Sequence, residues 1–424
     1  MICIIIFALT LLSYIINKIP MWVTALLSLA ALYITGCVDA SGALAGFANS
    51  NTILMGACFV IASGFRRTSL VKIMCDGLLK MTNGSFMKVY FGYLLLTAIL
   101  TNFISSPMVV YAIVGPLLCA LCDTTGNSRS RYMFPLMVVC VACCFALPLP
   151  VAIQKAGEFN GYLETYNFAG AEFVPMDFLI ARTPILVFTI LWAFLLGPRM
   201  CPEKPALPVA TGGEQKDISS KLSPTVDKIG MVIFTVTMVA LVFSTQLKIP
   251  SWWIALTGSL LMALFGVVDQ KKALSEIPWE MLMLYVGALA LGTGLVNTGA
   301  GEAIGNWLAA IVGGTHNNYV LGALFFVIPF LMTQFMLNRS VQAVFIPICL
   351  LTCQALGAQP VGLVMCVASA CQTAFMTPMA TPAVAMCMGD GGYDLKSLFK
   401  SGWLVCILLS VVSVFYIMTV YPAF

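Results

Sequence analysis

Three long stretches of this chain contain no charged side chain. Residues 22–38, 230–244 and 404–420 lack Asp, Glu, Lys and Arg and are mostly apolar. Runs of this length and composition are typical of helices that cross a membrane. The whole chain is 60% hydrophobic and 9% charged, whereas soluble domains carry about 25% charged residues. Because so few charges cannot cover so large an apolar core in water, the sequence predicts an all-α membrane protein.

An internal repeat constrains the architecture further. The segment IPMWVTALLSLAALYITGCVDASGAL, from Ile19, corresponds to IPSWWIALTGSLLMALFGVVDQKKAL, from Ile249, 230 residues later. The segment LTNFISSPMVVYAIVGPLL, from Leu100, corresponds to MTQFMLNRSVQAVFIPICL, from Met332. The shared order of these segments predicts two copies of one structural unit.

The polar, Pro- and Gly-containing text between the copies reads as a linker. We therefore expect a first transmembrane repeat at 1–200, a cytoplasmic linker at 201–226 and a second transmembrane repeat at 227–424. Helices are expected in the first repeat at about 2–17, 21–37 and 52–65, with the same plan in the second.

Polar or proline residues interrupt two apolar stretches in the first copy. TNFISSP interrupts 86–121, and PLP interrupts 133–153. Irregular backbone at membrane depth is tolerated only where it is covered by protein or lines a cavity. We expect the first stretch of each copy to be a re-entrant hairpin and the second to be a broken helix. Each copy then crosses the membrane five times, so the second copy is inverted, an arrangement typical of secondary transporters.

The distribution of Lys and Arg agrees with this count. With hairpins in place of full spans, all but four of the 21 Lys and Arg residues fall on one side, which the positive-inside rule assigns to the cytoplasm. The exceptions are Lys155, Arg182 and Lys248, predicted outside, and Arg339, in the second hairpin. Both termini are predicted to face outward from the cell membrane.

Residues for enzyme chemistry are sparse, so no enzyme is expected. The one histidine, His316, stands in a polar loop, and the C-x-x-C pairs starting at Cys119 and Cys140 lie in apolar helical text, where cysteine behaves as a small apolar residue. No Asp or Glu lies in a predicted tip or break. This disfavours a cation antiporter, which normally carries protons on an intramembrane carboxylate.

Two hairpin tips and two helix breaks should meet near the membrane midplane. The tips are 101–107 and 333–340, and the breaks are 148–150 and 377–382. Such breaks expose backbone carbonyls, which suit a small hard cation, and helix N-termini, which suit an anion.

On these residues the chain resembles the divalent anion/sodium symporter family, of the dicarboxylate/sulfate permease type, within the ion-transporter superfamily. The resemblance covers nearly the whole chain. It implies homodimers with inverted repeats that transport di- or tricarboxylates or sulfate, usually by Na⁺-coupled symport and alternating access. The family's hallmark is Ser-Asn-Thr at each hairpin tip, about nine residues before a proline, paired with a Thr-Pro-containing break.

The resemblance implies two kinds of site in the second copy. Its substrate residues would be Asn338, Arg339, Thr381 and Pro382. Its Na⁺ ligands would be Thr333, Met336, Asn338 and the carbonyl of Ala380.

The first copy departs from the family pattern. Pro107 stands where the family has Asn, and a one-residue bulge is needed to bring Ser105 and Ser106 to the substrate. The remaining candidates for a Na⁺ site in this copy are Asn102, Ser106 and Pro150.

Two basic residues have alternative interpretations. Arg339 is the only charged residue between Glu302 and Asp390; it either binds an oxyanion through its guanidinium or caps carbonyls of the opposite hairpin arm. Lys155 either replaces a lost Na⁺ or lies at the outer surface. A literal Ser-Asn-Thr at 50–52 is expected to be an ordinary helix start.

Several functions stay open at this point. The main expectation is Na⁺-coupled uptake of a small dianion, and succinate, citrate and sulfate are not distinguished. The alternatives are Na⁺-independent anion exchange, a cation antiporter or arsenite-type permease of the same superfamily, and a channel or scaffold.

Overall fold

The computed structural model describes most of the chain, namely residues 2–16, 18–69, 85–209, 222–269, 274, 277, 279–311, 317–335, 337–377 and 381–424. The predicted Na⁺ ligands Met336 and Ala380, and His316, lie outside the described residues. Within the described residues the regular structure is helical throughout.

Helices fill both halves of the chain. Those of the first half are α1 (Ile2–Ile16), α2 (Met21–Ile34), α3 (Ala40–Ala48), α4 (Ser50–Arg67), α6 (Phe86–Phe103), α7 (Pro107–Thr125), α8 (Arg129–Ala142), α9 (Pro150–Thr165), α10 (Pro175–Leu195) and α11 (Gly197–Met200). Those of the second half are α12 (Pro224–Val242), α13 (Ser244–Leu247), α14 (Ser251–Leu264), α15 (Trp279–Asn297), α16 (Ala300–Ile311), α17 (Asn318–Thr333), α18 (Asn338–Leu356), α19 (Pro360–Cys371), α20 (Pro382–Gly391) and α21 (Leu395–Val420).

The outer surface of these helices is apolar. By length and composition, seven helices of the described residues could cross a membrane. On α21, Ile407, Val411 and Phe415 are each more than half exposed. Val232 and Val236 of α12 are also more than half exposed. A contiguous apolar surface of this kind suits lipid rather than water. The predicted all-α membrane protein is confirmed.

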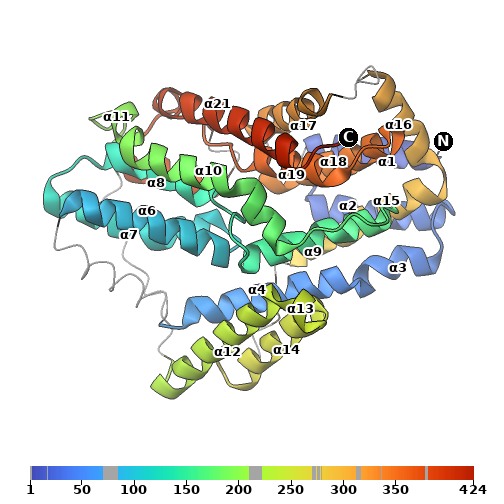
Figure 1. Ribbon diagram of the computed structural model, residues 1–424, viewed down its shortest axis with the longest axis horizontal. Helices are drawn as coiled ribbons and strands as arrows, with labels where there is room; N and C mark the ends of the chain where they lie inside the picture. Colours follow the sequence, from blue (N-terminus) through green and yellow to red (C-terminus); the bar gives the residue numbers. More distant parts are fainter. Residues whose placement is uncertain are drawn as a thin grey trace.

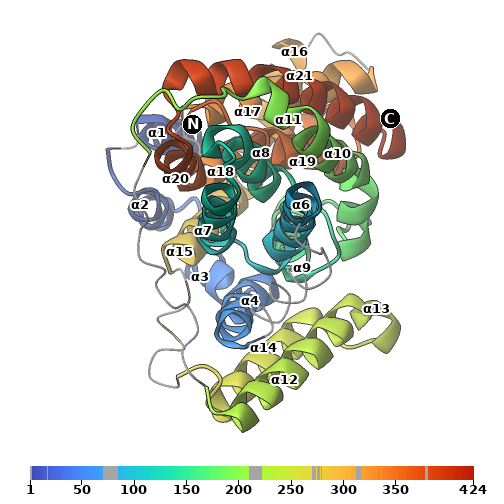
Figure 2. The same ribbon diagram turned by 90° about the vertical axis from the view of Figure 1, so that its left-hand side faces the viewer.

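The two halves pack against each other in a reciprocal way. Helix α2 of the first half lies along α15 of the second, and α14 of the second half lies along α4 of the first (Figures 1 and 2). The approach of α2 to α15 is close because Gly287 has no side chain. A Cβ placed there would stand 2.6 Å from the backbone carbonyl of Ala25.

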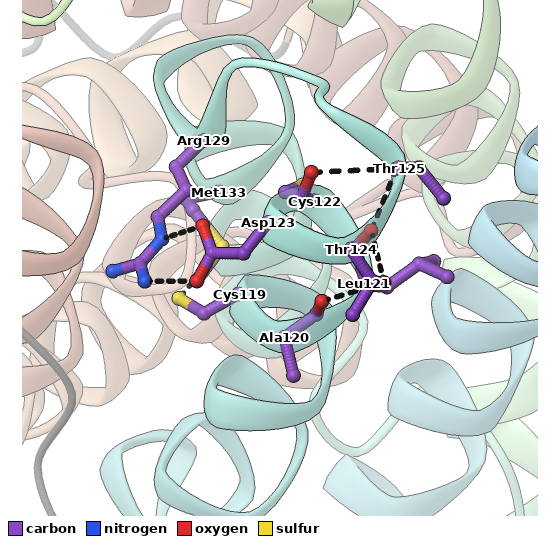
Figure 3. Close-up of polar contacts among 9 residues, drawn as sticks. All are labelled: Cys119, Ala120, Leu121, Cys122, Asp123, Thr124, Thr125, Arg129 and Met133. Carbon is purple, nitrogen blue, oxygen red and sulfur yellow. Dashed lines mark hydrogen bonds and ion pairs between the residues drawn. The ribbon is translucent and has the colours of Figure 1, made fainter.

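Helices α6 and α7 form a hairpin. The start of α6 and the end of α7 both lie next to the start of α8. The ring of Phe86, at the start of α6, packs on Tyr132 near the start of α8, with centroids 4.8 Å apart. At the end of α7, Asp123 forms an ion pair with Arg129, the first residue of α8 (Figure 3). Between them, Gly126 takes a left-handed conformation with φ of 70° that ends α7. The open end of this hairpin therefore lies at the start of α8.

Helices α17 and α18 form the second hairpin, and its open end lies at the C-terminus of the chain. The Asn318 side chain, at the start of α17, accepts backbone bonds from Ala423 and Phe424 at 3.1 and 3.0 Å. Gln359, just after α18, donates to the carbonyl of Ala423 at 2.8 Å. Both arms of this hairpin thus reach the same end of the molecule.

The two hairpins open at opposite ends of α21. This helix has 26 residues, so its ends stand about 39 Å apart. Its last turn precedes the C-terminal residues that hold the second hairpin. At its other end, the Tyr393 hydroxyl donates to the carbonyl of Ser130, at the open end of the first hairpin, at 2.5 Å. Figure 1 shows both chain termini in the right-hand half of the molecule, with α11 near the left-hand end.

Both helix breaks begin earlier than the sequence predicts. The first runs from Cys143, after α8, to Pro150, the first residue of α9, and the second begins after Cys371 and ends at Pro382. The prolines mark only where each second half-helix starts. Helix α8 ends at Ala142, six residues before Pro148, and within the break Phe145 has a φ of 45°, which few non-glycine residues adopt.

The Ser-Asn-Thr at 50–52 is a helix start, as predicted. It forms the first turn of α4, and the Asn49 side chain caps that turn by accepting from the Asn51 amide at 2.8 Å. The Thr52 hydroxyl donates to the carbonyl of Gly46.

Candidate functional site

The tip of the first hairpin is bonded directly to the first helix break. Thr101 donates its hydroxyl to the carbonyl of Cys140 at 2.7 Å, and the Asn102 amide donates to that of Cys143 at 2.9 Å. The same Asn102 side chain accepts from the backbone amide of Leu147 at 2.9 Å. Both side chains are fully buried. Asn102 therefore clamps the break, and its oxygen already has a donor.

The tip of the second hairpin is arranged differently. Thr333, at the end of α17, donates its hydroxyl to the Asn338 side-chain oxygen at 2.7 Å across the tip. Thr377, in the second break, donates to the backbone carbonyl of Gln334. The Gln334 side-chain oxygen is buried and has no partner among the described residues. Oxygen atoms thus converge at this tip, and one of them lacks a donor.

A cavity of about 280 Å³ lies between the two tips and the two breaks. All six residues predicted to bind substrate line it: Ser105, Ser106, Asn338, Arg339, Thr381 and Pro382. The structure therefore brings together residues more than 270 positions apart in the sequence. Their role as ligands remains a prediction.

Residues that the sequence did not single out also line this cavity. Gln154, Gln342 and Gln372 supply amide groups, and Phe145 supplies an aromatic wall. The Ser105 hydroxyl donates to the Gln154 side chain at 2.8 Å, which ties the first tip to α9. Gln154 and Gln342 are polar residues inside apolar helices, so their direction depends on helix rotation, which the sequence does not show. Gln372 directly follows α19, at the start of the second break.

Four helix N-termini meet at the cavity. Its walls include first-turn residues of α7, α9, α18 and α20, represented by Pro107, Val151, Asn338 and Pro382. No side chain of the described residues caps any of these four N-termini. Free N–H groups and the positive end of the helix dipole attract anions. The backbone alone therefore makes the cavity favourable for negative charge.

Two basic side chains line the cavity, and only Lys155 is paired with a carboxylate of the described residues. The Arg339 side chain is exposed into the cavity, and no hydrogen bond or ion pair joins it to another described residue. Lys155 is buried, with its ammonium 2.8 Å from Glu158 and 2.7 Å from the Gln342 side-chain oxygen. No Asp or Glu stands among the described residues that line the cavity.

Two of the lysines and arginines predicted outside are in fact interior. Lys155 is 9% exposed and Arg182 is fully buried, whereas Lys248 is exposed. Arg182 donates to the carbonyl of Ala142 and to the Ser369 hydroxyl, each at 2.7 Å. The positive-inside rule assigns a basic residue to one side of the membrane. It does not predict whether that residue is buried among the helices.

The structure places the three residues predicted to bind Na⁺ in the first half in different surroundings, and their role as ligands stays a prediction. The Asn102 oxygen is taken up by a backbone amide, and Pro150, which starts α9, is buried outside the cavity lining. Ser106 lines the anion cavity instead. In the second half, the Asn338 oxygen likewise accepts a hydrogen bond, from Thr333, whereas the buried Gln334 oxygen has no partner among the described residues.

A larger hollow of about 680 Å³ lies elsewhere, between α4, α9 and the chain that follows α9. Asn51 lines it together with the carboxylates of Glu164 and Glu172. Because those carboxylates repel an anion, this hollow is a poorer candidate for the substrate site than the cavity between the tips.

A helical membrane protein with paired hairpins and paired broken helices around one polar cavity is built as a membrane transporter. The chain belongs to the citrate transporter (CitMHS) family, whose model matches residues 11–338 and, in a second match that overlaps the first, 238–424.

Individual relatives agree with this assignment. The chain is 25% identical over 407 residues to an uncharacterized transporter of Haemophilus influenzae, covering 92% of this chain and 85% of the relative. It is 22% identical over 449 residues to the sodium-dependent dicarboxylate transporter SdcS of Staphylococcus saprophyticus, covering 96% and 84%. The resemblance to divalent anion/sodium symporters is thereby confirmed.

The fold also has a solved counterpart. The crystal structure of the YdaH transporter of Alcanivorax borkumensis matches with a TM-score of 0.64 at 16% identity, covering 91% of this chain and 89% of the other. This similarity supports the transporter fold.

Proposed function

We propose that this protein is a secondary active transporter of small dianionic carboxylates, with di- and tricarboxylates as the substrate class. The observation that carries the proposal is the cavity itself. Four helix N-termini without a side-chain cap from the described residues meet there, together with the Arg339 guanidinium, which no hydrogen bond or ion pair joins to another described residue. Guanidinium groups bind carboxylates through two parallel hydrogen bonds. The match to the citrate transporter family and to a dicarboxylate transporter supports the same class.

In this proposal the two halves are repeats with opposite orientation in the membrane. The two hairpins open at opposite ends of α21, so each tip approaches the cavity from its own side. Movement of the hairpins and broken helices against the remaining helices would expose the cavity to one side at a time. The side of Arg129 and Arg131 would be cytoplasmic, the termini would lie outside, and the protein would be a homodimer.

Coupling to Na⁺ would use the second half. Thr333 and Asn338 would contribute to the ion site, because their oxygen atoms stand together at the second tip. The SdcS relative, described as sodium-dependent, supports this coupling.

Uptake into proteoliposomes tests both parts of the proposal. We expect labelled succinate or citrate to accumulate when a Na⁺ gradient is imposed, with sulfate as the competing dianion. Thr333→Ala should raise the Na⁺ concentration for half-maximal uptake about tenfold, which corresponds to the loss of one hydrogen-bonding oxygen. The matched control is Thr352→Ala in α18, whose hydroxyl bonds only the carbonyl of Ile348 in its own helix. Equal Na⁺ dependence in wild type and Thr333→Ala would refute the ion site.

Proton coupling is a second candidate, favoured by one specific observation. Glu158 is a buried carboxylate beside Lys155 and lines a small hollow together with Arg339. An intramembrane carboxylate of this kind can carry a proton. If protons drive uptake, Glu158→Gln should abolish the effect of a pH gradient, while Glu164→Gln, at an exposed position of the same helix, should not. A pH effect that persists in Glu158→Gln would exclude this residue as the carrier.

A further inference from the structure

The C-terminal end of α8 is the place in the first half where backbone carbonyls would be available to a cation. The last turn of a helix has carbonyls without intrahelical partners, and the helix dipole makes this end negative. Here three donors from elsewhere in the chain occupy such oxygens. In the first tip, Thr101 donates to the carbonyl of Cys140 and Asn102 to that of Cys143. The Arg182 guanidinium donates to the third carbonyl, that of Ala142, at 2.7 Å.

Arg182 reaches this position from α10, outside the hairpin. Its second terminal nitrogen donates to Ser369 in α19, so one guanidinium joins the two broken helices. The guanidinium carbon lies 4.3 Å from the ring centre of Phe145, which lines the anion cavity. No carboxylate of the described residues pairs with Arg182.

A fully buried arginine without a carboxylate partner is costly. Such a residue in a membrane protein normally has a function. The groups that compensate its charge are a helix C-terminus, a hydroxyl and an aromatic face. A helix C-terminus at a broken helix is also the kind of group that binds a transported cation in secondary transporters. Arg182 therefore occupies the electrostatic position of an ion.

We propose that Arg182 is a permanent cation that replaces a coupling ion in the first half of the protein. This inference rests on the proposed transport function. It assigns any Na⁺ coupling to the second half alone, so that each chain binds at most one Na⁺. It also means that part of the positive potential at the anion cavity is present whether or not Na⁺ is bound.

Equilibrium binding of radioactive sodium to the purified full-length protein counts the sites directly. We expect at most one ion per chain, lost in Thr333→Ala. Two ions per chain would overturn the proposal. Binding of no ion would support the inference about the first half and contradict Na⁺ coupling, so the two proposals can fail separately.

Substitution of Arg182 tests the charge itself. Arg182→Gln keeps N–H donors but removes the charge, and we expect one additional bound Na⁺ or citrate binding weakened at least tenfold. Arg182→Lys, which keeps the charge, should restore both values toward wild type, which a merely structural role would not require. A folded Arg182→Gln with wild-type Na⁺ and citrate binding would overturn the proposal. If Arg182→Gln does not fold, a folded Arg182→Lys decides: near-normal citrate binding supports the proposal, and its loss refutes it.

Discussion

Replacing Arg339 by alanine is expected to weaken the binding of citrate or succinate about 100-fold, on the order of 3 kcal/mol. The guanidinium is exposed into the cavity and is bonded to no other described residue, so its donors are available to a substrate carboxylate. Isothermal titration of the purified protein measures this affinity, and uptake into proteoliposomes measures its consequence for transport. The melting temperature should stay close to that of wild type, because no hydrogen bond or ion pair to another described residue is lost.

Two further variants separate charge from geometry in this prediction. Arg339→Lys keeps the charge but loses the planar pair of donors, so we expect an intermediate loss of about tenfold. Arg199→Ala removes an exposed arginine at the end of α11 and should leave affinity unchanged. Wild-type affinity in Arg339→Ala would mean that this arginine does not bind the substrate.

Replacing Gly287 by alanine is expected to destabilise the protein by about 3 kcal/mol, since overpacking against rigid backbone is costly. The new Cβ would stand 2.6 Å from three atoms of Ala25, two of them in the backbone carbonyl. Because this is backbone rather than a flexible side chain, α2 and α15 would have to move apart. A fall of roughly 5 °C in melting temperature is the expected result.

The same substitution at Gly56 is the matched control. This glycine lies in α4, and a Cβ there would meet only the tip of Leu282, at 3.6 Å, an ordinary contact. Alanine also has the higher helix propensity, so Gly56→Ala should be neutral or stabilise by up to about 1 kcal/mol. An equal melting temperature for both variants would show that α2 and α15 do not pack as closely as described.

Much of the fold follows from local patterns in the sequence. Uncharged apolar runs predict the membrane-spanning helices, and polar or proline residues within such runs predict the hairpins and breaks. The tips at Ile104 and at Phe335 lie where those interruptions stand. Each break begins earlier than its prolines indicate, because α8 ends at Ala142 and α19 at Cys371, where no proline or glycine marks a helix end in the sequence.

The candidate site was predictable only in part. Arg339, Asn338 and Thr381 stand at interruptions of apolar text, and all three line the cavity. Gln154 and Gln342 line it as well, although they lie inside continuous helices, where sequence spacing gives no indication of their direction. Asn102 stands at an interruption and yet is used as a clamp on the first break.

By itself, the sequence determined the solvent, the helical class and which apolar runs are interrupted, because each depends on residues close together in the chain. The tertiary structure alone decided which polar groups meet. Arg182 and Ser369 are separated by 187 residues, as are Lys155 and Gln342, and each pair meets only because of how their helices are rotated and packed. A side chain's partner depends on that packing, whereas its membership in an apolar run does not.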